Sequence, residues 1–243
     1  EVVKNKKAKM LSVLILLFSL NGFAQEHNHE HDHDHDHSTE KAGDSHSEGT
    51  AHVRVKPTQK QLDSLLTAFK VSPEHAAKFG RLIIQDAGGR MKPINTFLSY
   101  LLRKVSHSNT FTGMNSDQVF LSMTQSAQFW IEIPLIYIKS GNDSIRKIIG
   151  IDSKDKYAPF IAFFDEKGNY KLSPYLDAAY KAGNPNQFEK DFVETDKKVN
   201  LMESALSGSI LRIFPIPNDP GNKWISYLEL EHAGMKGMDS TYT

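Results

Sequence analysis

The stretch Pro93-Ile-Asn-Thr-Phe-Leu-Ser-Tyr-Leu-Leu-Arg-Lys-Val-Ser106 carries the clearest structural pattern in the chain. Its apolar positions are Ile94, Phe97, Leu98, Leu101, Leu102 and Val105. They recur every three or four residues and so fall on one face of an α-helix. The pattern therefore predicts an amphipathic helix that begins after Pro93 and ends near Ser106.

Upstream of this helix, three segments carry clear local signals. Residues 58–69 combine apolar residues at helical spacing with Thr58 and Gln61 at the spacing of a capping box. Residues 72–80 begin with serine followed by proline, which is a common start of a helix. Residues 82–92 contain an apolar run and then a glycine pair, which indicates a tight reversal. We therefore expect two short helices followed by a reversal of the chain.

Downstream, further helices and short strands are indicated. In chain order they are a helix at 116–123 capped by Ser116 and Asp117, a strand at 133–138, a helix at 143–149, a turn at 166–169, a helix at 175–182 started by Ser173-Pro174, a long amphipathic helix at 186–208, and two strands at 210–214 and 223–228. The chain shows no internal repeat and no βαβ alternation. The predicted fold is α+β, a helix-rich domain with a few short strands.

The composition excludes several classes of protein. With 243 residues, 39% of them hydrophobic, the chain is long enough to bury one sizeable core. Lys plus Arg equals Asp plus Glu at 29 each, and no basic stripe is interleaved with aromatic residues, so nucleic acid is not an expected partner. The chain has no cysteine, which excludes disulfides, thiolate metal sites and heme attachment through a C-x-x-C-H motif.

The N-terminal region has the layout of an export signal or of a membrane segment. Lysines between residues 4 and 9 precede an apolar run from Met10 to Ala24. The run is shorter than the roughly 20 residues of a spanning helix and ends on a small-x-small pattern, so a cleaved signal and a retained span both remain open. In both cases the residues after Gln25 are expected outside the cytoplasm. The predicted divisions are a cytoplasmic basic stretch at 1–9, a hydrophobic segment at 10–25, a disordered His-rich linker at 26–56 and an extracytoplasmic domain at 57–243.

The linker contains a tract in which every second residue is histidine. The tract consists of His27, His29, His31, His33, His35 and His37, separated mostly by acidic residues. In an extended chain the imidazoles lie on one side, a donor set that suits Zn²⁺, Ni²⁺, Co²⁺ or Cu²⁺. Binding of Zn²⁺ or Ni²⁺ is expected to be loose, because a low-complexity tract holds its ligands in no fixed geometry. The tract is either a solvated spacer, which we favour, or a dedicated metal collector.

The rest of the sequence carries no catalytic signature. It lacks a Walker loop, a Rossmann fingerprint, a zincin helix and a nucleophile elbow. The turn at 86–90, together with Arg81, Arg90 and Lys92, has backbone N–H groups that are able to cradle an anion, although most glycine pairs only make a turn. The turn is thus the one candidate anion site.

Histidine and tryptophan residues remain as candidates for binding a metal or a cofactor. His75, His107 and His232 are candidate metal or heme ligands, although isolated histidines near helix ends are more commonly cap or surface residues. Trp130 and Trp224 lie in apolar runs, so we expect them to anchor the core and not to form a shelf for a cofactor.

Two segments of the sequence resemble a known family. They are Phe79-Gly-Arg-Leu-Ile-Ile-Gln-Asp-Ala-Gly-Gly-Arg-Met-Lys-Pro-Ile-Asn-Thr96, leading into Leu101-Leu-Arg-Lys104, and Gly208-Ser-Ile-Leu-Arg-Ile-Phe-Pro-Ile-Pro217, followed by Lys223-Trp224. Over roughly residues 57–242 the chain resembles the extracytoplasmic domain of the fused ResB/CcsA cytochrome c biogenesis proteins of Bacteroidota, the CcsBA type of system II. The lysine-rich, hydrophobic and histidine-rich order before it is similar to the join between the two halves of such fusions.

The resemblance implies an accessory domain of a larger membrane protein, a cytochrome c heme lyase or synthase that handles heme and ligates it to apocytochrome c. It implies flanking ResB-like and CcsA-like membrane regions, and a place on the periplasmic side of the inner (cytoplasmic) membrane. The family's tryptophan-rich heme-binding segment and heme-ligating histidines are absent from this sequence, so no catalytic or cofactor-binding residue carries over. We expect the chain to be a piece of a longer reading frame. The alternative is an exported metal-binding protein that uses the His tract.

Overall fold

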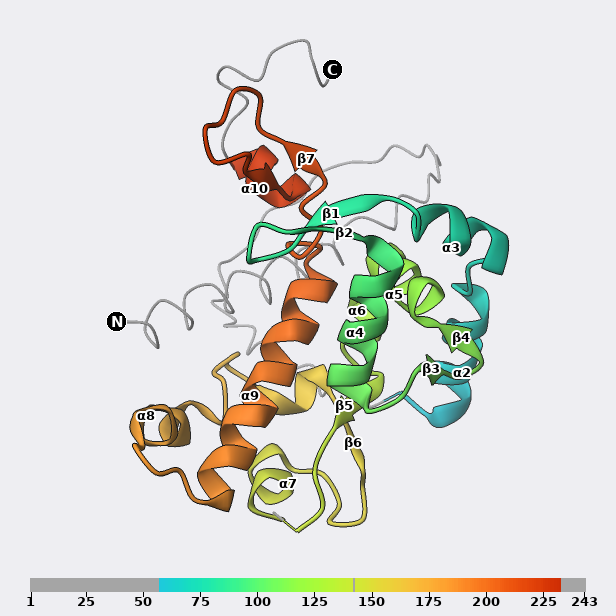
Figure 1. The fold of residues 1–243 in the computed structure, drawn as a ribbon. Helices are drawn as coiled ribbons and strands as arrows, with labels where there is room; N and C mark the ends of the chain where they lie inside the picture. The colour runs from blue at the N-terminus through green and yellow to red at the C-terminus, as the bar shows by residue number, and fades with distance from the viewer. Residues whose placement is uncertain (1–56, 142, 233–243) are drawn as a thin grey trace, which may run out of the picture.

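The computed structural model describes residues 57–141 and 143–232 (Figure 1). The first half contains α2 (Gln59–Ala68), α3 (Pro73–Phe79), β1 (Ile83–Gln85), β2 (Met91–Pro93), α4 (Ile94–Ser106), β3 (Thr110–Phe111), β4 (Met114–Asn115), α5 (Ser116–Gln125) and α6 (Ala127–Trp130). The second half contains β5 (Pro134–Tyr137), α7 (Asp143–Ile149), β6 (Tyr157–Pro159), the 3-10 helix η2 (Phe160–Phe163), α8 (Ser173–Lys181), α9 (Gln187–Leu206), β7 (Phe214–Pro215), β8 (Trp224–Ile225) and α10 (Tyr227–His232). The expected helix-rich α+β fold is confirmed.

The strands of the described part are short and pair locally. Each belongs to a two-stranded antiparallel sheet, with β1 paired to β2, β3 to β4, β5 to β6 and β7 to β8. In the first sheet Gln85 lies opposite Met91 and Ile84 opposite Lys92, on either side of the predicted reversal. The pairs β1–β2, β3–β4 and β7–β8 are therefore hairpins, whereas β5 and β6 pair across the segment that contains α7.

The helix starts follow from capping residues. Thr58 and Gln61 form the predicted capping box of α2, and Ser72 caps α3. The prediction for α5 was wrong by one residue, because Asn115 caps the helix and forms its capping box with Gln118. Asparagine, aspartate and serine are nearly equivalent as N-caps, so neighbouring residues of these types compete for the cap position. The position is set by which of them has a glutamine or glutamate three residues downstream to complete a capping box.

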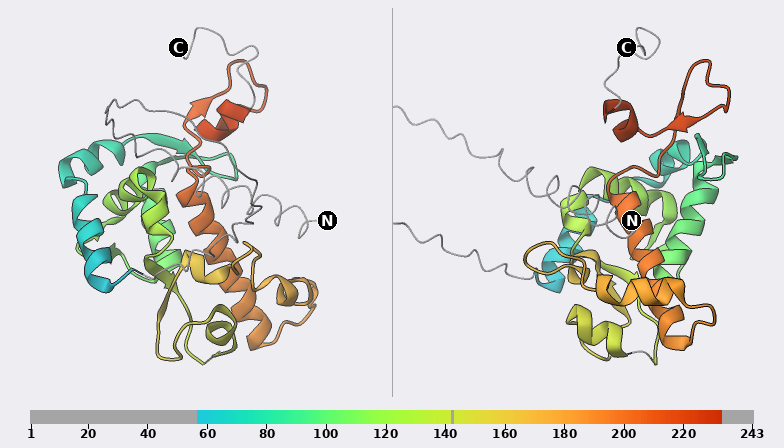
Figure 2. Two further views of the ribbon diagram at one scale, coloured as in Figure 1. Left: turned by 180° about the vertical axis from the view of Figure 1, so that it is seen from behind. Right: turned by 90° about the vertical axis from the view of Figure 1, so that its left-hand side faces the viewer.

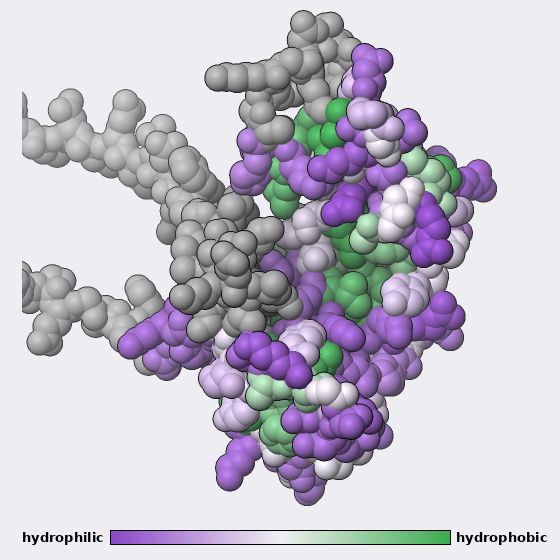
Figure 3. Space-filling view, turned by 60° about the vertical axis from the view of Figure 1, so that its left-hand side comes forward, coloured by the Kyte–Doolittle hydropathy of each residue, from purple (hydrophilic) through white to green (hydrophobic). Residues whose placement is uncertain are grey.

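The core lies between α4, α5 and α9. α4 and α9 run side by side through the middle of the molecule (Figure 1), and α5 packs against both. Their apolar faces are buried together with those of η2 and β5. The largest fully buried side chains include Phe120, Trp130, Phe160, Phe163 and Phe192. On the face drawn in Figure 3, hydrophilic residues cover most of the surface and apolar residues gather in the recessed area between them.

Three further predictions need correction. Ser173 is the first residue of α8 and not its cap, since the cap position is Leu172 and makes no side-chain hydrogen bond. The strands expected at 210–214 and 223–228 are shortened to β7 and β8, and α10 follows instead of a longer strand. Phe188 is one of the apolar positions whose spacing predicts the helix at 186–208, but it is 42% exposed because it lies in the first turn of α9, beyond the edge of the core.

The two ends of the molecule are built differently. β7, β8 and α10 project beyond the β1–β2 hairpin at one end, whereas α7 and α8 lie at the other (Figures 1 and 2). Within the described residues, no helix combines the length and apolar character needed to cross a bilayer. The hydrophobic segment at 10–25 and the His tract lie outside the described residues.

Candidate functional site

The two segments that carry the family resemblance meet at one residue, Gln85. Its backbone N–H donates to the carbonyl of Arg212 (3.1 Å). Its side-chain Nε2 donates to the carbonyls of Gly89 (3.2 Å) and Asn222 (2.9 Å), and its Oε1 accepts from the backbone N–H of Trp224 (2.7 Å). The amide thus bonds through both its donor and its acceptor atoms while only 7% of the residue is exposed. We call this contact between the β1–β2 and β7–β8 hairpins the Gln85 junction.

We predict that Gln85→Ala weakens the Gln85 junction by about 2–4 kcal/mol, because the substitution leaves backbone groups of Asn222 and Trp224 without their partner. Hydrogen exchange at the amide of Trp224 and urea unfolding measure the effect. Gln59→Ala is the matched control, since the Gln59 side chain is exposed and bonds only to Asp63 within α2. Equal losses in both variants would contradict the role assigned to Gln85.

The candidate anion site is occupied by a side chain of the protein itself. The carboxylate of Asp86 accepts hydrogen bonds from the backbone N–H groups of Gly88 (2.8 Å) and Arg90 (3.0 Å). It also forms ion pairs with Lys92 and, at 3.4 Å, with Arg90. Lys92 and these backbone groups hold the pKa of Asp86 well below its usual range. The turn is therefore stabilised by its own anion, and Arg81, the third cation of the expected cradle, is exposed.

His107 belongs to a cluster of ionisable side chains at the other end of α4. It ends α4 in a left-handed conformation (φ 57°), and its ring stacks on Tyr137 at 4.1 Å between centroids. Its Nε2 lies 3.8 Å from the Glu194 carboxylate, which also pairs with Lys198 at 3.2 Å. Lys198 in turn donates to the carbonyl of Tyr137 (3.1 Å). Burial, and then the charge of Lys198, lower the pKa of His107, and burial lowers the pKa of Lys198.

We predict that His107→Asn reduces the loss of stability in mild acid. Folded His107 binds its proton less tightly than an unfolded histidine with pKa 6.5. The unfolded state therefore takes up more protons below about pH 6.5, and stability falls from there down to the lowered folded pKa. Because the His107 side chain is 47% exposed, solvent screening keeps this effect below about 1 kcal/mol. Asparagine tolerates the left-handed conformation.

Urea unfolding at pH 5.5 and 7.5 compares this variant with the natural chain. His75→Asn is the control, because His75 is exposed near the start of α3. The prediction fails if the two variants show the same difference between the two pH values.

A buried carboxylate that the sequence analysis missed joins α8 to α9. Asp196 is 1% exposed and accepts from the hydroxyl of Tyr180 (2.6 Å) and the side chain of Asn200 (2.9 Å). Burial and the neighbouring Asp196 raise the pKa values of both Tyr170 and Tyr180. The available signal was its spacing, because Asp196 lies four residues after Phe192 on the apolar face of α9. The cluster docks α8 onto α9.

The remaining candidate ligands are separated in the fold. His75 lies in the first turn of α3, His107 ends α4, and His232 ends α10 with Nδ1 2.6 Å from the carbonyl of Leu228. Between residues 57 and 232, leaving out residue 142, no three His, Asp or Glu side chains come close enough to share a metal ion. Trp130 is the expected core anchor, whereas Trp224 is only half-buried. The His tract, His27 to His37, lies outside the described residues.

The fold is a helix-rich α+β domain in which the Gln85 junction connects the β7–β8 hairpin to the β1–β2 hairpin by hydrogen bonds. The chain is similar to protein NrfI of Wolinella succinogenes, with 35% identity over 162 residues, which are 66% of this chain and 18% of NrfI. The chain thus spans less than a fifth of the length of that curated relative. No known family model matches the chain.

Proposed function

We propose that the chain is an accessory, extracytoplasmic domain of a membrane protein for cytochrome c biogenesis. The observation that carries this proposal is the 35% identity to NrfI, which supports a role in cytochrome c biogenesis. The resemblance of residues 79–96 and 208–217 to the ResB/CcsA fusions supports the finer assignment to heme delivery and ligation. In this proposal the domain lies on the periplasmic side of the membrane, and ResB-like and CcsA-like regions flank it.

The arrangement of the described residues favours a positioning role over a catalytic one. Thioether formation needs heme held with its vinyl groups beside reduced cysteines, and such positioning requires axial ligands in an apolar pocket. The three candidate histidines lie on different elements: His75 in α3, His107 at the end of α4 and His232 at the end of α10. The Gln85 junction instead connects the start of the domain to the hairpin that precedes α10. We infer that the domain braces the parent protein or guides apocytochrome c.

The test compares the natural full-length protein with the isolated chain in a host that lacks its own cytochrome c maturation genes. We predict that the full-length protein attaches heme to a C-x-x-C-H reporter, that deletion of residues 57–232 lowers the yield at least about tenfold, and that the isolated chain attaches none. Heme staining of denaturing gels and the mass of the reporter measure covalent heme. Full yield after the deletion, or covalent product from the isolated chain above a protein-free control, would contradict the proposal.

The second candidate, metal collection, is favoured by the six alternating histidines from His27 to His37. Replacing all six by serine separates the two functions. Under the first proposal the yield of cytochrome c stays unchanged while binding of Zn²⁺ or Ni²⁺ is lost. Under the second, the loss of metal binding removes the function of the protein.

A further inference from the structure

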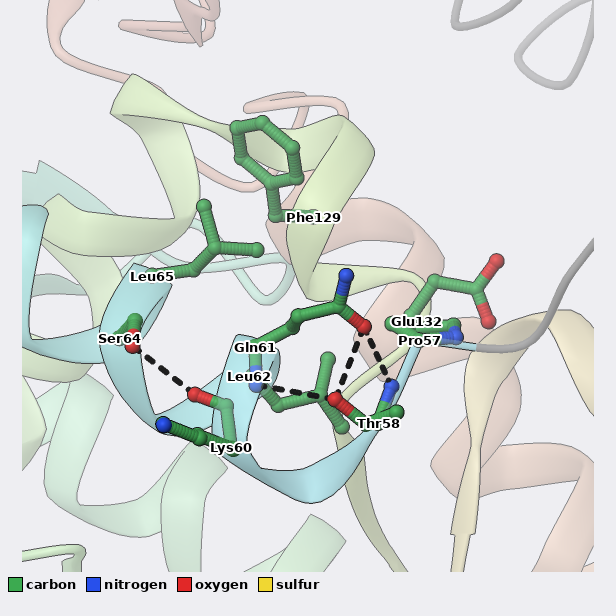
Figure 4. A pocket seen from close by; sticks show the side chains of 9 residues that line it. All are labelled: Pro57, Thr58, Lys60, Gln61, Leu62, Ser64, Leu65, Phe129 and Glu132. Atoms are coloured by element: carbon green, nitrogen blue, oxygen red, sulfur yellow. Dashed lines mark hydrogen bonds between the residues drawn. The ribbon is translucent and has the colours of Figure 1, made fainter.

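An apolar groove lies between α2 and α6, directly beside the first described residue. Its volume is about 510 Å³. The apolar residues of its lining are Leu62 and Leu65 of α2, Phe129 of α6 and Pro57 (Figure 4). Phe129 also contacts Phe69 at 5.5 Å between ring centroids, so the wall that α6 contributes is held to the end of α2.

Several polar groups of the groove bond to one another. The Thr58 backbone N–H donates to Gln61 Oε1 (2.8 Å), and the Gln61 backbone N–H donates to Thr58 Oγ1 (3.4 Å). The Ser64 hydroxyl donates to the carbonyl of Lys60 (2.9 Å), as Figure 4 shows. Most of the surface exposed in the groove is apolar, and its exposure to water is unfavourable. The groove therefore suits an occupant with small apolar side chains.

The chain itself carries such side chains immediately before the groove. Between residues 25 and 56, the only apolar side chains larger than alanine are Val53 and Val55. Residues that precede proline favour an extended backbone, which applies to Lys56 before Pro57. In an extended segment Val53 and Val55 point to the same side. At roughly 3.3–3.6 Å per residue, Val55 and Val53 can lie up to about 7 Å and 14 Å from Pro57, which itself lines the groove.

The charges of this segment match the edge of the groove. Arg54 and Lys56 alternate with the valines and so point away from the apolar lining. Glu132 and Pro57 both line the groove (Figure 4), so a carboxylate belongs to the same lining as the residue that follows Lys56. We propose that residues 53–56 dock in the α2–α6 groove, with Val53 and Val55 against Leu65 and Phe129.

This docking moves the start of the folded domain from residue 57 to residue 53. The linker that carries the His tract then joins the domain along the α2–α6 face, on the side of α4 and α5 away from α8 (Figure 1). The inference does not depend on the proposed function, because it rests on the groove and on the sequence before it.

Engineered disulfides in the full chain test the proposal, because the chain has no cysteine of its own. The test variant carries Val53→Cys and Leu65→Cys, and the matched control carries Arg54→Cys and Leu65→Cys. Their loop lengths differ by one residue, but the two side chains at positions 53 and 54 point to opposite sides. Under mild oxidation, the intramolecular disulfide is expected to form about tenfold faster in the test variant, because a disulfide requires close and correctly directed Cβ atoms.

Equal rates in the two variants would overturn the proposal. A disulfide that links two chains would also overturn it, because the groove would then take a second copy. Hydrogen exchange adds a measurement that needs no cross-link. Val53→Ser combined with Val55→Ser is expected to speed exchange in α2 several-fold, whereas Arg54→Ser leaves it nearly unchanged. Unchanged exchange in the valine variant would assign the groove to an external partner.

Discussion

Replacing Arg146 by methionine is expected to lower the free energy of unfolding by about 3–5 kcal/mol, the largest loss for any single polar side chain of the described domain. The residue is only 3% exposed. Its guanidinium donates to the carbonyls of Ile138 (2.8 Å), Lys139 (3.0 Å) and Asp155 (2.8 Å). It thereby holds the end of β5 and the loop before β6 against α7. Methionine fills much of the volume but leaves these carbonyls without donors.

Urea unfolding followed by circular dichroism measures this effect, and Lys147→Met is the control. Lys147 is the next residue of α7 and is exposed, so the control changes charge and volume in a similar way without breaking a buried contact. Arg146→Lys is expected to be intermediate, because a single ammonium group does not reproduce the planar fork of arginine. If Arg146→Met and Lys147→Met cost the same, the buried guanidinium does not hold this region together.

Trp130→Ala is expected to cost about 3–5 kcal/mol, because it removes the largest fully buried side chain and leaves a cavity. The indole is 1% exposed, packs 5.8 Å from the ring of Phe111, and donates from Nε1 to the hydroxyl of Ser122 (3.0 Å). The substitution therefore loses apolar contacts and also leaves the partner hydroxyl with one hydrogen bond fewer. Thermal unfolding and urea unfolding measure the change.

The second tryptophan of the chain is the natural comparison. Trp224 lies half-buried in β8, and its backbone rather than its indole bonds to Gln85. Trp224→Ala is therefore expected to cost less, about 1–2 kcal/mol. Trp130→Phe should fall between the two alanine variants, since it keeps an aromatic ring in the core. A larger loss for Trp224→Ala would show that the stability of the domain depends on the C-terminal hairpin more than on its core.

The helix boundaries show how far local patterns predict this fold. The helix at 94–106 and the helix at 143–149 were predicted with the bounds that α4 and α7 have. The capping box of α2 was also predicted from the spacing of Thr58 and Gln61. These features depend on residues three or four positions apart, so they can be identified from the sequence alone. The hairpin of β3 and β4 was missed because each of its strands has only two residues.

The candidate site was predicted less well than the fold, since its contacts join residues far apart in the chain. The sequence placed a tight turn at residues 86–89, but only the structure shows that Asp86 fills the expected anion cradle. Histidines, which look like ligands in a sequence, turned out to lie on separate elements. Gln85, which looks like an ordinary polar end of an apolar run, connects two hairpins.

The fold class, the caps of α2 and α3 and the family resemblance follow from the sequence alone, because each depends on residue types at short, fixed spacings. The roles of Gln85, Arg146 and Asp196 depend on tertiary packing. Each is a polar side chain that is buried in the packed fold, and each bonds to groups outside its own helix or strand. Burial makes an unpaired polar group costly, so these residues hold the hairpins and helices in one arrangement, and no local pattern reveals which partners they take.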